Sequence, residues 1–242
     1  MRRQVHLIAG LGDNNDQQNS IKNYLQQYSD YFSSIAGGAW DASEIIYHQT
    51  PSLEKLNEAL VKENLDFAIV VMIGHGAVKN DLHIFKLNEN EIIHSGQLYT
   101  NSNKHIIILE SCRCEIQNIN TVDLKDKIPK FEHGGIVRSP ITRELAKQLY
   151  FNSISNCVND HIVCFACDIN QTANNFYFSY GLLQTCMNWH LTPQPHRETL
   201  GINKIMNHLN SEINKLSRNQ IGESQNPTIN GFANFPFAVG KF

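Results

Sequence analysis

Residues 66–76 read Asp-Phe-Ala-Ile-Val-Val-Met-Ile-Gly-His-Gly, and this stretch decides the fold class. Its apolar part is continuous rather than alternating, which is typical of a parallel strand buried on both faces of a sheet. The glycines on either side of His75 let the backbone turn sharply where the strand ends. A second run of the same character, from His105 to Leu109, ends at Glu110-Ser111-Cys112. We therefore expect two central strands that deliver a histidine and a cysteine at their carboxyl ends.

Weaker patterns around these two strands complete an alternation of strands and helices. Shorter apolar runs predict strands at 4–9, 45–47 and 161–166, and helical periodicity predicts helices near 18–28, 53–60, 141–151, 177–190 and 202–216. A small hairpin is expected from 82–85 and 91–94. The helix near residue 53 follows Thr50-Pro51, a capping residue and a proline. The chain is therefore expected to be an α/β protein whose mostly parallel sheet carries helices on both faces.

The length of the chain suits a single domain. Its 242 residues, of which 41% are hydrophobic, are enough to bury one full core, so we expect one domain over residues 1–242. The segment at about 113–139 is polar, contains Pro129 and Gly134-Gly135, and shows no sustained period. It is expected to be a long exposed loop.

Charge and hydropathy argue against several classes of partner. With 20 Lys and Arg against 23 Asp and Glu, the formal net charge is -3, and no broad basic surface for nucleic acid or an anionic membrane is expected. The apolar stretch 5–9 is too short for a secretion signal, and 67–73 is too short to span a bilayer. Six irregularly spaced cysteines do not resemble the framework of a small disulfide-bonded domain. We expect a cytoplasmic protein with reduced thiols, and its oligomeric state is left open.

The two strand-end residues form a chemically sufficient pair. In open α/β sheets the reactive crevice lies beyond the carboxyl ends of the strands, where both His75 and Cys112 are expected. A thiolate is the nucleophilic form of cysteine, and an adjacent imidazole can take its proton and pass it to a leaving amine. The backbone N–H groups of Gly76 and Cys112 are candidates to stabilise a tetrahedral oxyanion. The pattern therefore predicts acyl transfer.

The motifs also resemble a known family. Residues 67–76 resemble the strand and Gly-His-Gly motif of caspases, metacaspases and their bacterial relatives, and residues 106–113 resemble the strand that ends at their catalytic cysteine. Further resemblance is found at 165–173, 178–183, 225–227 and 235–237. It implies a caspase-like three-layer sandwich and a cysteine endopeptidase with Cys112 as nucleophile, His75 as general base and acid, and Gly76 as oxyanion donor. No third member of a catalytic triad follows from it.

The resemblance also bears on the substrate. In metacaspases the residue two before the catalytic cysteine is acidic and helps to hold a basic P1 side chain, and Glu110 occupies that position. The residue two before the histidine is small and polar in those enzymes but is Ile73 here, which leaves an apolar P1 residue open. Asp168, in the third similar segment, is a further candidate for substrate binding.

The remaining implications concern partners and regulation. The resemblance implies a protein or peptide substrate, no cofactor, and a role in a bacterial cell-death or defence pathway. No cluster of calcium ligands is evident in the sequence, although some metacaspases depend on calcium. If P1 is basic, the loop offers candidate self-cleavage sites at Lys125, Lys127, Lys130 and Arg138.

Each of these interpretations has a less specific alternative. The alternative to a peptidase is a catalytically inactive caspase-fold scaffold or interaction module. The alternative for Glu110 is a strand-end carboxylate that caps backbone N–H groups. A zinc site at Cys112/Cys114 or Cys164/Cys167 is disfavoured, because the second pair spans a strand, in which only alternate residues share a face. A dinucleotide site at Gly10-Leu11-Gly12-Asp13 lacks the third glycine. The other cysteines are expected to be inert thiols, namely Cys114, Cys157, Cys164, Cys167 and Cys186.

Overall fold

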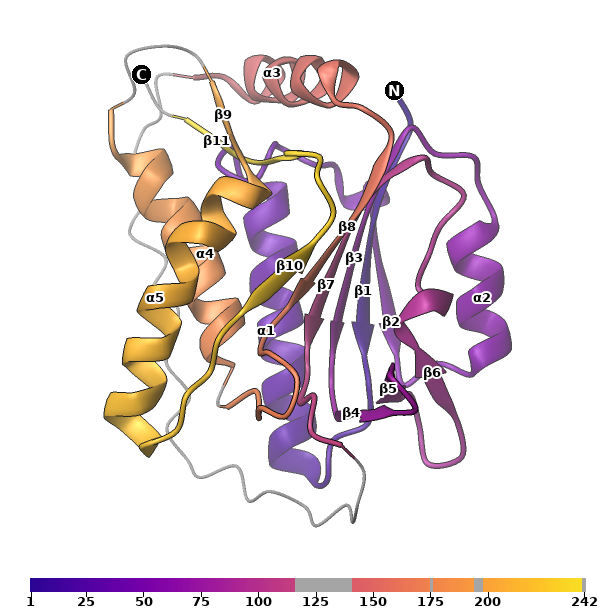
Figure 1. Ribbon diagram of the computed structural model, residues 1–242. Helices are drawn as coiled ribbons and strands as arrows, with labels where there is room; N and C mark the ends of the chain where they lie inside the picture. Colours follow the sequence, from indigo (N-terminus) through magenta and orange to yellow (C-terminus); the bar gives the residue numbers. More distant parts are fainter. Residues whose placement is uncertain (116–140, 175, 194–197, 241–242) are drawn as a thin grey trace.

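A six-stranded sheet forms the centre of the protein. The computed structural model describes residues 1–115, 141–174, 176–193 and 198–240, and the sheet has the order β10-β8-β7-β3-β1-β2 (Figure 1). Its strands are β1 Arg3–Ala9, β2 Ile45–Gln49, β3 Phe67–Ile73, β7 Lys104–Glu110, β8 Asp160–Phe165 and β10 Thr228–Asn230. All neighbours pair in parallel except β10, which runs antiparallel to β8 at the edge. The expected mostly parallel sheet is confirmed.

Helices cover both faces of this sheet, as expected. They are α1 Asn15–Ser33, α2 Leu53–Val61, α3 Arg143–Asn156, α4 Tyr177–Leu191 and α5 Ile202–Ile221. Figure 1 shows α1, α4 and α5 on one side of the sheet and α2 on the other. Within β3, Val71 packs into the core beneath α1, α3, α4 and α5, whereas Val70 and Met72 pack into the core beneath α2. The apolar run of β3 is continuous because each face of the strand is buried under its own layer.

Smaller elements extend the second layer and the edges. The expected hairpin is present as β5 Leu82–Lys86 and β6 Ile92–His94, and β4 Gly76–Lys79 makes it a three-stranded antiparallel sheet. A second small sheet pairs β9 Thr199–Gly201 with β11 Pro236–Val239. The short 3-10 helices are η1 Ala42–Glu44 and η2 Ser95–Gln97.

Helix α1 is longer than expected, and helix α2 has a different cap. Helix α1 begins after Asn14, whose side chain accepts the backbone N–H of Gln17, and it continues to Ser33. Helix α2 is capped by Ser52, which accepts the N–H of Lys55, and not by Thr50, which has a positive φ of 40°. A side-chain cap places the start of a helix more reliably than a threonine-proline pair does, because it satisfies an N–H that otherwise has no partner.

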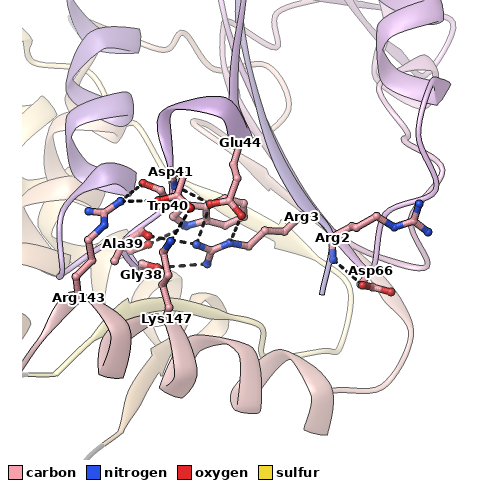
Figure 2. Close-up of polar contacts among 11 residues, drawn as sticks. Arg2, Arg3, Gly38, Ala39, Trp40, Asp41, Glu44, Asp66, Arg143 and Lys147 are labelled. Carbon is pink, nitrogen blue, oxygen red and sulfur yellow. Dashed lines mark hydrogen bonds and ion pairs between the residues drawn. The ribbon is translucent and has the colours of Figure 1, made fainter.

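A buried arginine ties the start of β1 to the segment before β2. The guanidinium of Arg3 is bidentate to Glu44, at 2.9 and 3.1 Å, and lies 4.0 Å from the centre of the Trp40 ring (Figure 2). Its remaining N–H groups face the carbonyl oxygens of Gly38 and Ala39. The charge is therefore buried with its donors satisfied, which a buried cation requires.

The expected exposed loop lies almost entirely outside the described residues, since only Arg113, Cys114 and Glu115 of it are described. Within the described ranges, no helix combines the length and hydropathy needed to cross a membrane.

Candidate active site

His75 and Cys112 follow adjacent strands of the sheet. Strands β3 and β7 pair in parallel with Ile73 opposite Glu110, and the N–H of Gly74 continues the ladder to the carbonyl oxygen of Glu110 at 3.2 Å. Continuing this register by two residues places His75 opposite Cys112. The sheet thus brings the two candidate catalytic residues to neighbouring positions on one edge.

His75 contacts two side chains from the loop and helix that follow β1. Its Nε2 atom lies 3.1 Å from Oδ1 of Asp13 and 3.1 Å from Oε1 of Gln17. The side chain of His75 is 32% exposed and that of Asp13 is 34% exposed, so this contact is partly shielded from solvent. The sequence analysis did not assign Asp13 or Gln17 to the site. Their position depends on the pairing of β1 with β3, which sets Ala9 opposite Ile73 and so starts both loops side by side.

The thiol of Cys112 is partly buried. Its Sγ atom lies 3.9 Å from the carbonyl oxygen of Ala173, and burial raises the pKa of the thiol to about 11. No hydrogen bond joins the Cys112 thiol to the His75 ring in the described part of the chain, which includes both residues. A thiol in this environment is protonated at neutral pH, so its reaction requires a base.

Gly76 lies directly against the cysteine segment. A Cβ atom added at Gly76 would fall 2.5 Å from Oγ of Ser111, 2.7 Å from Cβ of Ser111 and 3.1 Å from the carbonyl oxygen of Cys112. Such distances are too short for any side chain, so glycine is the residue that permits this approach. The N–H groups expected to form an oxyanion hole, those of Gly76 and Cys112, therefore belong to segments in contact.

A buried histidine that the sequence analysis did not single out supports the same segment. Nε2 of His83, on β5, lies 3.1 Å from the carbonyl oxygen of Cys112 and 3.0 Å from Oγ of Ser111. Its ring packs against Phe85 and Phe165, and burial lowers the pKa of His83 to about 4. The imidazole is therefore neutral at physiological pH and holds the backbone of Cys112 through a hydrogen bond. The hairpin was expected from the sequence, but its role as a support behind Cys112 was not.

Glu110 and Ile73, two of the expected substrate-binding residues, are buried. Ile73 is 0% exposed within the main core, and Glu110 is 3% exposed. The carboxylate of Glu110 accepts the backbone N–H of Ser179 at 2.6 Å, which is the capping contact that the alternative interpretation described. Burial raises the pKa of Glu110 to about 7, and hydrogen bonds from Ser179 oppose that rise. A substrate side chain would reach either residue only after neighbouring groups moved.

Asp168 is exposed and lies in a segment packed beside Cys112. Oδ1 of Asp168 accepts the N–H of Ile169, and the backbone of Arg113 exchanges hydrogen bonds with Asn170 and Gln171. The guanidinium of Arg113 lies 4.0 Å from the centre of the Phe165 ring. Asp168 is thus the expected substrate-binding residue whose side chain is open to solvent.

The remaining cysteines are dispersed through the described structure as free thiols. Burial raises the pKa of Cys157, Cys164, Cys167 and Cys186, to about 12 for Cys186. Burial therefore keeps these four thiols protonated at neutral pH. Among the described residues, no group of three or more His, Cys, Asp or Glu side chains is arranged to hold a metal ion.

Comparison with known proteins identifies the fold. The sequence matches no protein-family model and no curated protein. The structure is similar to that of caspase-1 from Spodoptera frugiperda, with a TM-score of 0.55 and 9% identity over 99% of this chain and 90% of that chain. It is also similar to the Drosophila initiator caspase Dronc, with a TM-score of 0.53 and 11% identity over 98% of this chain and 80% of that one. The protein has a caspase-like fold, as the sequence motifs implied.

Proposed function

We propose that the protein is a cysteine endopeptidase that cleaves a protein substrate through Cys112 and His75. The observation that carries the proposal is the placement of these two residues at the ends of adjacent parallel strands, with Gly76 against the cysteine segment. An imidazole beside a thiol, and N–H groups beside both, are the parts that acyl transfer needs. The similarity of the fold to two caspases supports the same class of reaction.

The chemistry follows in two balanced steps. His75 takes the thiol proton of Cys112, the sulfur attacks the peptide carbonyl carbon, and the oxyanion faces the N–H groups of Gly76 and Cys112. Collapse breaks the C–N bond, and the imidazolium gives its proton to the leaving amine. Water then loses a proton to His75 and attacks the thioester, which releases the acid and returns the proton to the thiol.

The proposal includes a P1 residue that is basic, as Glu110 suggests, or apolar, as Ile73 suggests. Because both side chains are buried, the exposed Asp168 is the more accessible of the three candidate contacts. A substrate library with arginyl, lysyl, leucyl and aspartyl P1 residues separates these classes. A preference for Asp at P1 would contradict both. A bacterial cell-death or defence pathway and a reducing cytoplasm belong to the proposal through family resemblance alone.

Two single variants test the proposal. Cys112→Ala should abolish peptide hydrolysis and leave the fold intact, because it removes only the nucleophile. Cys114→Ala is the matched control, since Cys114 lies two residues away and contacts Oγ1 of Thr172 at 3.6 Å. Hydrolysis that persists in the Cys112→Ala protein would refute the assignment. The intact masses of wild type and Cys112→Ala, compared after purification, test self-cleavage in the same experiment.

A catalytically inactive scaffold is the second candidate function. The raised pKa of Cys112 and the contact of its thiol with Ala173 favour it, because a protonated thiol with no bond to His75 in the described structure is not yet a nucleophile. Peptidyl chloromethyl ketones with varied P1 residues separate the two candidates. No adduct on Cys112 with any of them would support the scaffold.

A further inference from the structure

The loop between β1 and α1 is built as a fixed platform beside His75. The first turn of α1 holds it through two glutamine side chains: Gln18 accepts the N–H of Gly12 at 2.8 Å, and Gln17 accepts the N–H of Asp13. The N–H of Gly10 donates to the carbonyl oxygen of Ile73 at 2.8 Å, which joins the start of the loop to the end of β3. Hydrogen bonds to β3 and to side chains in the first turn of α1 therefore set the position of Asp13.

These contacts decide which nitrogen of His75 carries the proton. Because the backbone N–H of Asp13 donates to the terminal atom of Gln17 that faces it, that atom must be the amide oxygen. The same oxygen and Oδ1 of Asp13 both lie 3.1 Å from Nε2 of His75. Two acceptors facing one ring nitrogen require a proton on it. In neutral His75, Nδ1 is thus the unprotonated nitrogen that remains to accept a proton.

We infer that Asp13 is a positioning residue that completes an Asp13, His75 and Cys112 arrangement, an inference that rests on the peptidase function proposed above. The carboxylate fixes the ring of His75 with Nε2 protonated and Nδ1 free to take the Cys112 proton. It also stabilises the imidazolium formed when that proton moves, because an opposite charge lies 3.1 Å away in a partly shielded site. Gln17 contributes orientation without charge.

The charge of Asp13 is important because the Cys112 thiol does not ionise readily by itself. A partly buried Cys112 with a raised pKa yields little thiolate at neutral pH unless the imidazolium that forms beside it is stabilised. A partly exposed pair interacts more weakly than the buried carboxylate of a serine peptidase triad. We therefore expect a loss of about tenfold on removing the charge of Asp13, smaller than the roughly 10⁴-fold loss known for a buried triad.

The test is the rate at which iodoacetamide alkylates Cys112, followed by mass spectrometry across pH. Iodoacetamide is small and neutral, so its reaction does not depend on a P1 pocket. Asp13→Asn retains an oxygen for the Nε2 proton and loses the charge, whereas Asp13→Ala loses both. Asp16→Asn, an exposed carboxylate one residue into α1, is the matched control.

At pH 6.5 we expect Asp13→Asn to be alkylated about tenfold more slowly than wild type, and Asp13→Ala to be at least as slow. The rates should converge near pH 11, where the thiol ionises without assistance. Asp16→Asn should match wild type throughout. With a cleavable peptide, kcat should fall in the Asp13 variants while KM changes by less than about twofold.

Equal alkylation profiles in wild type and both Asp13 variants would overturn the inference. So would a change limited to KM for substrates with Lys or Arg at P1, because that result makes Asp13 a substrate contact. Failure of the inference can be distinguished from failure of the proposed function. If wild type hydrolyses no peptide and its alkylation still depends on Asp13, the positioning role holds and the peptidase proposal fails. If wild type hydrolyses peptides and Asp13→Asn equals it, only the positioning role fails.

Discussion

The carboxylate of Glu110 accepts a hydrogen bond of 2.6 Å from the backbone N–H of Ser179, and this joins the end of β7 to the first turn of α4. The first N–H groups of a helix have no partner within the helix, and the positive end of its dipole favours an anion. Oε1 of Glu110 is buried without a hydrogen-bond partner in the described structure. The residue two before Cys112 therefore connects the strand that carries the nucleophile to the helix layer, and it does so at the cost of a buried carboxylate.

Replacing Glu110 by Gln should stabilise the protein above neutral pH. Burial raises the pKa of Glu110 to about 7 from the ordinary 4.5, so the carboxyl favours folding only while protonated, and that contribution is lost as pH rises from about 4.5 through 7. Gln keeps an acceptor for Ser179 and carries no charge. In urea denaturation at pH 8 we expect Glu110→Gln to exceed wild type by about 1–2 kcal/mol, with the difference shrinking toward pH 4.5.

The control for this change is Glu58→Gln, an exposed carboxylate on α2, which should leave the free energy of unfolding nearly unchanged at either pH. An effect of Glu110→Gln that is the same at pH 8 and pH 4.5 would show that the buried charge is not its cause.

Three buried histidines predict loss of stability in mild acid. Burial lowers the pKa of His6 to about 3, and of His83 and His105 to about 4, with His48 and His161 adding to the shifts of His6 and His105. Between pH 6.5 and about 4, these three histidines are protonated in the unfolded chain but stay neutral in the folded protein. The free energy of unfolding therefore decreases as pH falls. Glu110 acts in the opposite direction, because in this pH range its carboxyl group binds about one more proton in the folded protein than in the unfolded chain. We expect a net loss of about 2–3 kcal/mol per pH unit near pH 5.5, measured by urea denaturation.

Single substitutions can assign this pH dependence. His105→Gln should reduce the slope by about one proton, or about 1.4 kcal/mol per pH unit, because one buried base is removed. His208→Gln should not change it, since His208 is 66% exposed beside Glu212. A slope unaffected by His105→Gln would place the acid sensitivity elsewhere.

Breaking the ion pair of Arg3 and Glu44 should lower the free energy of unfolding. The side chain of Arg3 is 0% exposed, so Glu44→Gln leaves a buried guanidinium without its counter-charge. We expect Glu44→Gln to lower the free energy of unfolding by about 3 kcal/mol, and Arg3→Lys by about 2 kcal/mol through loss of the bidentate contact and of stacking on Trp40.

Figure 2 also shows the control, Asp66, which accepts only the exposed backbone N–H of Arg2 among the contacts drawn. Asp66→Asn should change stability by less than about 0.5 kcal/mol. Raising the salt concentration should leave the cost of Glu44→Gln almost constant, because a buried pair is little screened. A strong salt dependence would argue that water reaches the pair.

The sequence predicts the parts of this fold whose signal is local. Strands β3 and β7 are continuous apolar runs, so both they and the residues that follow them, His75 and Cys112, could be placed in advance. Strand β10 could not, because Thr228–Asn230 is three residues long and pairs only through the backbone of β8. Asp13 could not be assigned to the site from the sequence, because its contact with His75 depends on the register between β1 and β3, which no local pattern encodes. The fold class was therefore accessible from the sequence, but the groups that surround the two candidate catalytic residues required coordinates.

Gly76→Ala should impair the candidate site. The added Cβ would lie 2.5 Å from Oγ and 2.7 Å from Cβ of Ser111, so either the His75 segment or the Cys112 segment must move. Both peptide hydrolysis and the alkylation of Cys112 depend on the distance between these segments. We expect kcat/KM to fall by about 100-fold, because displacements on the order of 1 Å are that costly to catalysis.

A second substitution separates displacement from misfolding. Ser111→Gly removes both of the closest atoms and leaves the 3.1 Å approach to the carbonyl oxygen of Cys112, so the double variant Gly76→Ala with Ser111→Gly should recover part of the activity. His83 retains its contact with that carbonyl oxygen and continues to support the segment. Gly96→Ala is the control, since its added Cβ would meet only the His94 side chain at 3.1 Å and 3.2 Å. If Ser111→Gly gave no recovery while the double variant remained folded, contact with Ser111 would not be the cause of the loss, and the remaining 3.1 Å approach to the carbonyl oxygen of Cys112 would be the explanation to test.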